Sequence, residues 1–233
     1  MKKKMNDETL LQLCALEAFY TWHLIDAPFH KAFKKIAKDN KADADHINTA
    51  KAFTKEYKVA RNIRKASKEK FYNDELPKAL KAINNSKPGK IIDDLAERSE
   101  KFTHGICRSF FSKIGMMLRP IDFYPMDTYA KRGIKEKQRK RTGKAKSHRI
   151  QTYVTFYSDI TDYASTFKKE QFSISLLKES VSLVVNKWRC IYEPLLKIKE
   201  NSVDYKIILA RTLDKYLMIS DKKNPFDYTD FKA

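Results

Sequence analysis

The chain is poor in the residues that build tight turns and cross-links. Its 233 residues include 5 glycines, 7 prolines and 3 cysteines. So few turn-forming residues argue against a β-sandwich and favour long helices. The cysteines stand far apart without a CxxC pair, which argues against a zinc ribbon and excludes a four-cysteine iron–sulfur cluster within one chain. A sparse, odd set suits a reducing compartment, so we expect a cytoplasmic protein, nucleoid-associated if the source is prokaryotic.

Long apolar runs are also missing. No run reaches the ~18 residues that a membrane span needs. The N-terminus starts with lysines, but Asn6, Asp7 and Glu8 interrupt it and Glu17 breaks the apolar stretch that follows. This pattern is typical of an amphipathic helix and not of a signal peptide, so we expect no membrane partner.

Acidic residues are under-represented. The chain has 29 Asp and Glu against 48 Lys and Arg, a net charge of +19 at pH 7. Such an excess predicts a polyanionic partner, first of all nucleic acid; the alternative is a generally basic surface. The densest run, 131–149, holds ten Lys or Arg and one acid. Because Gly133 and Gly143 argue against a packed helix, we expect a solvated basic loop here, or an arm that orders on phosphates.

Hydrophobic residues make up 42% of the chain and aromatic residues 12%, enough for a folded core. Apolar spacing predicts an all-α protein of about eight to ten helices. No convincing strand pattern appears; the best candidate, YVTFY at 153–157, is short. Pro28 should reset the chain and Pro77 should kink or restart a helix. The expected helices cover 7–23, 29–38, about 43–83, 90–100, 106–118, 150–166, 172–198 and 202–219. The residues 84–89, NNSKPG, form the clearest loop.

The most informative stretch is 103–134. It predicts a tight turn at Gly105, a helix that ends at Arg119-Pro120, an extended approach, and a basic helix opened by Asp127. A carboxylate in that position is by itself an ordinary helix cap. On the preceding helix, we expect Asp93, Asp94 and Glu97 to form a solvated face. The five histidines show no ligand spacing, and we expect no metal site.

Two segments of this stretch resemble the helix–hairpin–helix DNA glycosylase superfamily. YPMDTYAKR resembles that family's VDTHVxR segment, and 103–109, THGICRS, occupies the place of its LPGVGxKTA hairpin. The segment SKIGMMLRPIDFYPMD is similar to an SKxLhFxxPxxFPxxD pattern found elsewhere in the family. The resemblance covers about 30 residues and extends weakly to 59–72 and the last helices. It departs from the family at His104, Cys107 and Ser109, where the family has proline, glycine and, in its imine-forming members, lysine.

The resemblance implies an all-α glycosylase fold with two helical subdomains and a cleft. Residues 1–50 and 151–233 would close the second subdomain around a central region, 51–150. It implies a monofunctional enzyme that flips a damaged or modified base out of double-stranded DNA, with Asp127 as the catalytic carboxylate and no cofactor. Serine cannot form an imine, so lyase chemistry would need another amine, for which Lys113 and Lys131 are the candidates.

The implied binding residues fall into two groups. The DNA-binding set is Gly105, Ile106, Cys107, Arg108, Ser109, Lys131, Arg132, Lys135, Arg139, Lys140 and Arg141. The candidates for gripping the flipped base are Tyr124, Tyr129 and Trp188, with Tyr57 as a further aromatic residue. Two alternatives remain: a non-catalytic nucleic-acid-binding protein on the same scaffold, or an all-α interaction module for an acidic partner. We expect a monomer, and the sequence leaves open which base is excised and whether it lies in the cell's own or foreign DNA.

Overall fold

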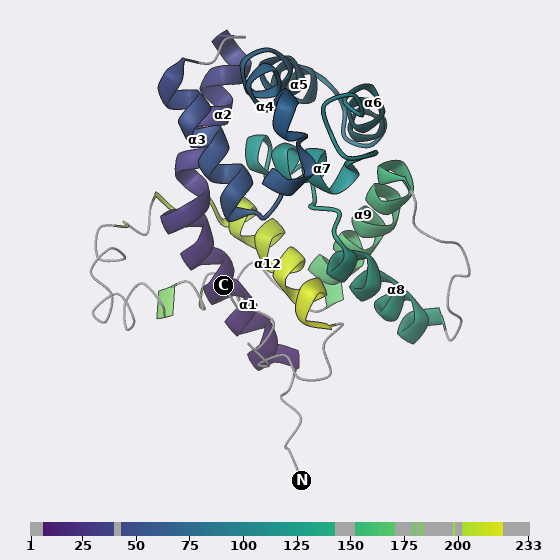
Figure 1. Ribbon diagram of the computed structural model, residues 1–233. Helices are drawn as coiled ribbons and strands as arrows, with labels where there is room; N and C mark the ends of the chain where they lie inside the picture. Colours follow the sequence, from purple (N-terminus) through teal and green to yellow (C-terminus); the bar gives the residue numbers. More distant parts are fainter. Residues whose placement is uncertain are drawn as a thin grey trace.

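A computed structural model describes residues 7–39, 43–142, 152–170, 179, 182–183, 198 and 202–220 (Figure 1). Within these residues the fold is all-α, as predicted; the only β-type contact is an isolated antiparallel bridge between Ile63 and Thr103. The weak strand candidate at 153–157 lies inside a helix, in agreement with the helix expected over 150–166. No helix in the described part is long and apolar enough to cross a membrane. The main helices are α1 (Asp7–Thr21), α2 (Ala27–Asp39), α3 (Ala44–Glu56), α5 (Leu76–Asn85), α6 (Lys90–Arg98), α7 (Arg108–Leu118), α8 (Thr128–Thr142), α9 (Tyr153–Glu170) and α12 (Tyr205–Ser220).

Two prolines lie inside continuous helices, each just after a π-helical turn. The turns are η1 (Trp22–Asp26), before Pro28, and η4 (Phe71–Glu75), before Pro77. Proline offers no N–H and crowds the carbonyl four residues earlier, and the wider turn removes that conflict. The expected reset at Pro28 is therefore wrong, because α1 passes through η1 directly into α2.

The helix expected to run from 43 to 83 ends early, at Glu56. Lys58 has a left-handed φ of 53°, and the N–H groups of Lys58 and Val59 bond back to the carbonyls of Lys55 and Thr54. This is the Schellman arrangement that closes a helix, and the side chain of Val59 is buried beside it. The chain then passes through short turns, η2 (Ala60–Asn62), η3 (Lys65–Ser67) and α4 (Lys68–Lys70), before η4.

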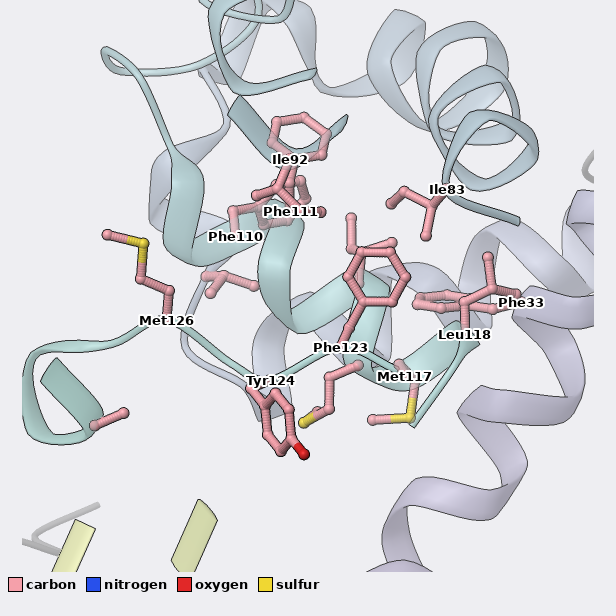
Figure 2. Packing of buried hydrophobic residues seen from close by; sticks show 14 of the residues in the cluster. Phe33, Ile83, Ile92, Phe110, Phe111, Met117, Leu118, Phe123, Tyr124 and Met126 are labelled. Atoms are coloured by element: carbon pink, nitrogen blue, oxygen red, sulfur yellow. The ribbon is translucent and has the colours of Figure 1, made fainter. Parts of the chain in front are cut away.

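Helix α7 lies at the centre of the core. It contacts α2, α5 and α6, and nearly all its residues from Phe110 to Leu118 are buried. Figure 2 shows Phe110 and Phe111 close to Ile92 of α6, and Leu118 close to Phe33 of α2. The segment that follows α7 adds Phe123, Tyr124 and Met126 to the same cluster. The largely buried α7 fixes the positions of the two segments that flank it, the turn at Gly105 and the approach to Asp127.

The two ends of the described chain pack together. Helix α12 lies between α1 and α8 (Figure 1). Gly133 of α8 makes this close approach possible, since a Cβ atom there would stand 2.3 Å from the carbonyl oxygen of Leu217. The expectation that the glycines keep 131–149 out of a packed helix is thus wrong up to Thr142, and 143–149 lie outside the described residues. The division into segments 1–50, 51–150 and 151–233 remains a prediction.

Candidate functional site

The turn at Gly105 is stabilised by a side chain of the same segment, that of Thr103. Gly105 has a φ of +78°, the left-handed region that glycine enters at least cost. The hydroxyl of Thr103 bonds to the carbonyls of Gly105, at 2.9 Å, and Ser99, at 3.0 Å. Cys107 has a φ of −96°, which any residue adopts. The family's second glycine is therefore not required here, and the cysteine departs from the family pattern without straining the turn.

The turn is also tied to the segment that follows α3. Backbone N–H groups of His104 and Arg64 bond to the carbonyls of Asn62 and Phe102, both at 2.9 Å. The Arg64 Nε donates to the carbonyl of Thr103 at 2.8 Å. Residues 62–64 thus lie antiparallel to 102–104, immediately before the Gly105 turn.

Arg108, the first residue of α7, makes internal ion pairs. Its guanidinium contacts the carboxylate of Asp93 and lies 3.2 Å from Glu97. Asp93 also accepts the N–H groups of Tyr153, at 2.9 Å, and Val154, at 3.0 Å, which satisfies the first turn of α9. Asp93 is 7% exposed and joins three helices, so its expected place on a solvated face is wrong, although Asp94 and Glu97 are exposed.

An extended segment brings Asp127 back beside α7. The hydroxyl of Ser112 accepts the N–H of Met126 at 2.8 Å, and the hydroxyl of Tyr153 accepts that of Tyr124 at 3.2 Å. Asp127 then opens α8, and its Oδ1 accepts the N–H of Ala130 at 2.8 Å. The predicted cap is therefore present. The side chain is only half-buried, so a carboxylate at a helix N-terminus stays open to solvent beside the core.

Lys113 is the cation associated with this carboxylate. It lies on α7, four residues after Ser109, so both residues share one helix face. Its Nζ donates to the carbonyl of Tyr57 at 3.4 Å. Burial lowers the pKa of the Lys113 ammonium, while the negative charges of Asp127 and Asp214 oppose that change. Lys113 therefore loses its proton more readily than an exposed lysine.

A buried ionic cluster lies next to Lys113. Arg211 of α12 is 3% exposed and pairs with Asp26 and Asp214, each at 3.1 Å. The hydroxyl of Tyr57 donates to Asp26, which is fully buried. Burial raises the pKa of Asp214 to about 6 against the opposing charge of Arg211. We call Asp26, Arg211, Asp214 and Tyr57 the buried ionic cluster; it fixes α12 against η1, the end of α3 and α7.

The aromatic candidates differ in exposure. Tyr57 belongs to the buried ionic cluster, and Tyr124 is 6% exposed with burial raising the pKa of its hydroxyl to about 12. Tyr129 is 37% exposed on the first turn of α8. Trp188 lies outside the described residues. Among these aromatic residues, Tyr129 offers the most surface to a ligand.

The predicted basic residues of α8 lie along its length. Arg132 and Arg139 are exposed, and Lys131 and Lys135 are half-buried. Arg139 pairs with Glu136 at 2.9 Å. The side chains of Lys140 and Arg141 are outside the described part of the structure. At the turn, Ile106 is 44% exposed, and Gly105, Cys107 and Ser109 are half-buried.

Sequence reasoning missed the buried ionic cluster entirely. Its residues come from positions 26, 57, 211 and 214, and no spacing rule connects residues so far apart. It also missed the basic segment from 58 to 70, although the signal was present as six Lys or Arg with one Glu. The run at 131–149 is longer and holds ten Lys or Arg, at a similar density.

Comparison with protein-family models, with curated proteins and with solved structures finds no significant match to this chain. Among the described residues, no group of three or more His, Cys, Asp or Glu side chains is arranged to hold a metal ion.

Proposed function

We propose that the protein is a DNA glycosylase that flips a damaged or modified base out of the duplex and hydrolyses its N-glycosidic bond. The supporting observation is the order of parts around α7. A glycine turn opens the buried helix, and an extended return places the half-buried carboxylate of Asp127 at the start of α8. The glycosylase superfamily that 103–134 resembles uses the same order of parts.

The chemistry suits a carboxylate in this place. Breaking an N-glycosidic bond builds positive charge on the sugar, as in glycoside hydrolysis, and a fixed negative charge stabilises it. One Asp127 oxygen holds the cap bond to Ala130, which orients the carboxylate. The same carboxylate can orient or deprotonate the attacking water.

Lys113 supports a second form of the reaction. It is an amine on the Ser109 face of α7, its pKa is lowered by burial, and it is electrostatically coupled to Asp127. A neutral amine attacks the sugar C1′, releasing the base, and the resulting imine leads to strand cleavage. Lys131, the other candidate from the sequence, lies on the first turn of α8, where its backbone N–H donates to the carbonyl of Asp127 at 3.1 Å.

The test is Asp127→Asn, assayed on a panel of duplexes that carry different base lesions. Asparagine caps a helix as well as aspartate does, so the fold should be kept. We expect base release to be lost and duplex affinity to be equal or slightly higher. The matched control is Asp43→Asn, because Asp43 caps α3 through an identical 2.8 Å bond to the N–H of His46. That control should release the base like the wild type.

Borohydride trapping separates the two forms of the reaction. A covalent adduct that forms with the wild type and not with Lys113→Gln supports imine chemistry, and base release without an adduct supports the monofunctional enzyme. If the wild type binds duplex DNA but releases no base from any lesion, the non-catalytic DNA-binding protein is the better description. An affinity that hardly depends on salt excludes both and favours a module for an acidic protein partner.

A further inference from the structure

A second basic surface lies beside the Gly105 turn. Its six cations are all exposed, and a single acid, Glu69, lies among them. Within the described part of the chain, none of the six pairs with a carboxylate. We call this set the 58–70 surface. It consists of Lys58, Arg61, Arg64, Lys65, Lys68 and Lys70.

The backbone fixes this surface against the turn. The antiparallel pairing of 62–64 with 102–104 holds Arg61, Arg64 and Lys65 next to the residues that lead into Gly105. The Arg64 Nε bond to the Thr103 carbonyl anchors that side chain through one nitrogen and leaves its terminal groups available. The two segments therefore form one unit, although about 40 residues separate them.

The turn's own arginine does not add to this charge. Arg108 is held by Asp93 and Glu97, and its positive charge is neutralised inside the protein. Cys107 makes no side-chain capping bond to α7, but its carbonyl accepts the N–H groups of Phe110, at 3.1 Å, and Phe111, at 3.3 Å. Free positive charge near the turn thus comes from the 58–70 surface, together with the exposed Lys101.

One residue of the surface, Arg61, also lies near Lys113. Burial is the main cause of the lowered pKa of Lys113, and the positive charge of Arg61 adds to it. Such coupling requires Arg61 to lie near Lys113. A strand that follows this surface would run from the Gly105 turn toward Lys113.

Lys58 begins the surface in a backbone conformation that favours glycine. It is the only non-glycine residue with a positive φ in the described chain, and helices that end this way most often have glycine there. Lysine at this left-handed position supplies a positive charge, which the more favourable glycine would lack. Strained positions of this kind gather at functional sites.

We propose that the 58–70 surface binds successive phosphates of the DNA strand that carries the target nucleotide. This proposal rests on the proposed function and extends it by naming where the backbone is held. Each lysine or arginine that neutralises a phosphate releases a counterion, so its contribution can be counted from the salt dependence of binding.

The experiment compares two triple variants with equal loss of charge. One is Lys58→Gln, Arg61→Gln and Lys65→Gln. The control is Lys34→Gln, Lys35→Gln and Lys38→Gln, three exposed lysines of α2. Lys35 is electrostatically coupled to Asp43, at the opposite end of α3 from Lys58, about 20 Å away at 1.5 Å per residue. Duplex affinity is measured by fluorescence anisotropy from about 50 to 200 mM salt.

We expect the slope of log affinity against log salt to fall by about 2.7 in the test variant, and affinity to fall on the order of a hundredfold near 0.1 M salt. The control should keep the wild-type slope. Equal slopes in test and control would overturn the role of the 58–70 surface while leaving the proposed function in place. A wild type without steep salt dependence would overturn the proposed function and this surface together. Matched helical circular dichroism of the two triples verifies that both are folded.

Discussion

Removal of Arg211 tests the buried ionic cluster most directly. Arg211→Met keeps the length of the side chain and leaves the carboxylates of Asp26 and Asp214 buried without their cation. Breaking a buried ion pair from one side costs about 3–5 kcal/mol, because the remaining charge is neither solvated nor paired. We therefore expect the free energy of unfolding at pH 8 to fall by this amount.

The loss should depend on pH in a defined direction. Burial already raises the pKa of Asp214 to about 6 in the wild type. A carboxyl with a raised folded-state pKa contributes stability below its unfolded pKa of about 4, and loses it as the pH rises through about 6. Without Arg211 the pKa of Asp214 rises further. Where the folded variant holds one proton more than the unfolded chain, each unit of falling pH adds about 1.4 kcal/mol to its free energy of unfolding. The stability lost by Arg211→Met at pH 5 should therefore be about 1–3 kcal/mol smaller than at pH 8.

Urea denaturation of both proteins at pH 5 and pH 8, followed by circular dichroism, measures this loss. The control is Arg139→Met, since Arg139 is an exposed arginine paired with Glu136 at 2.9 Å. An exposed pair contributes little to stability because solvent screens it, and its loss should vary little over this pH range. Adding Asp26→Asn and Asp214→Asn to Arg211→Met should recover part of the stability. A loss under about 1 kcal/mol at pH 8, or an equal loss at both pH values, would refute the account of a buried pair that requires its cation.

Two further substitutions test local geometry. Gly133→Ala should destabilise the fold by about 1–3 kcal/mol, although alanine has the better helix propensity. The added Cβ meets the backbone of Leu217, which cannot move aside as a flexible side chain can. A thermal midpoint at or above that of the wild type would contradict the close packing of α8 on α12. Lys58→Gly should raise the free energy of unfolding by about 0.5–1 kcal/mol and weaken duplex binding, whereas Lys58→Gln should weaken binding without stabilising. Glycine and glutamine variants of equal stability would mean that the left-handed backbone at Lys58 carries no strain.

Much of the helical architecture could be predicted from the sequence, because amphipathic spacing is a local property. The helices near 90–100, 106–118 and 202–219 were predicted close to their observed bounds. The errors came from local rules that tertiary structure overrides. Pro28 normally ends a helix, but a π turn accommodates it. Gly133 normally weakens a helix, but here it permits a close helix crossing.

The candidate site was predictable only where it is continuous in sequence. The turn at Gly105 and the cap at Asp127 follow from residue type and position, and both are present. The buried ionic cluster was not predictable, since burial of Asp26 and Arg211 depends on α12 reaching η1 across nearly the whole chain. The ion pair between Arg108 and Asp93 was not predictable either, because in the sequence Asp93 is one of several acidic residues on a polar helix face.

These hidden contacts change how the charge of +19 should be interpreted. A basic residue beside a predicted binding turn is counted as a phosphate ligand when only sequence is known, yet Arg108 has internal carboxylate partners. The cations of 58–70, which precede the turn by some 40 residues, have no such partners within the described chain and are brought to it by backbone pairing. An anion is attracted by charge that the fold leaves uncompensated, and that quantity depends on which carboxylates the tertiary structure places nearby. The charge available to an anionic ligand at the Gly105 turn is therefore a property of the packing of α3, α6 and α7.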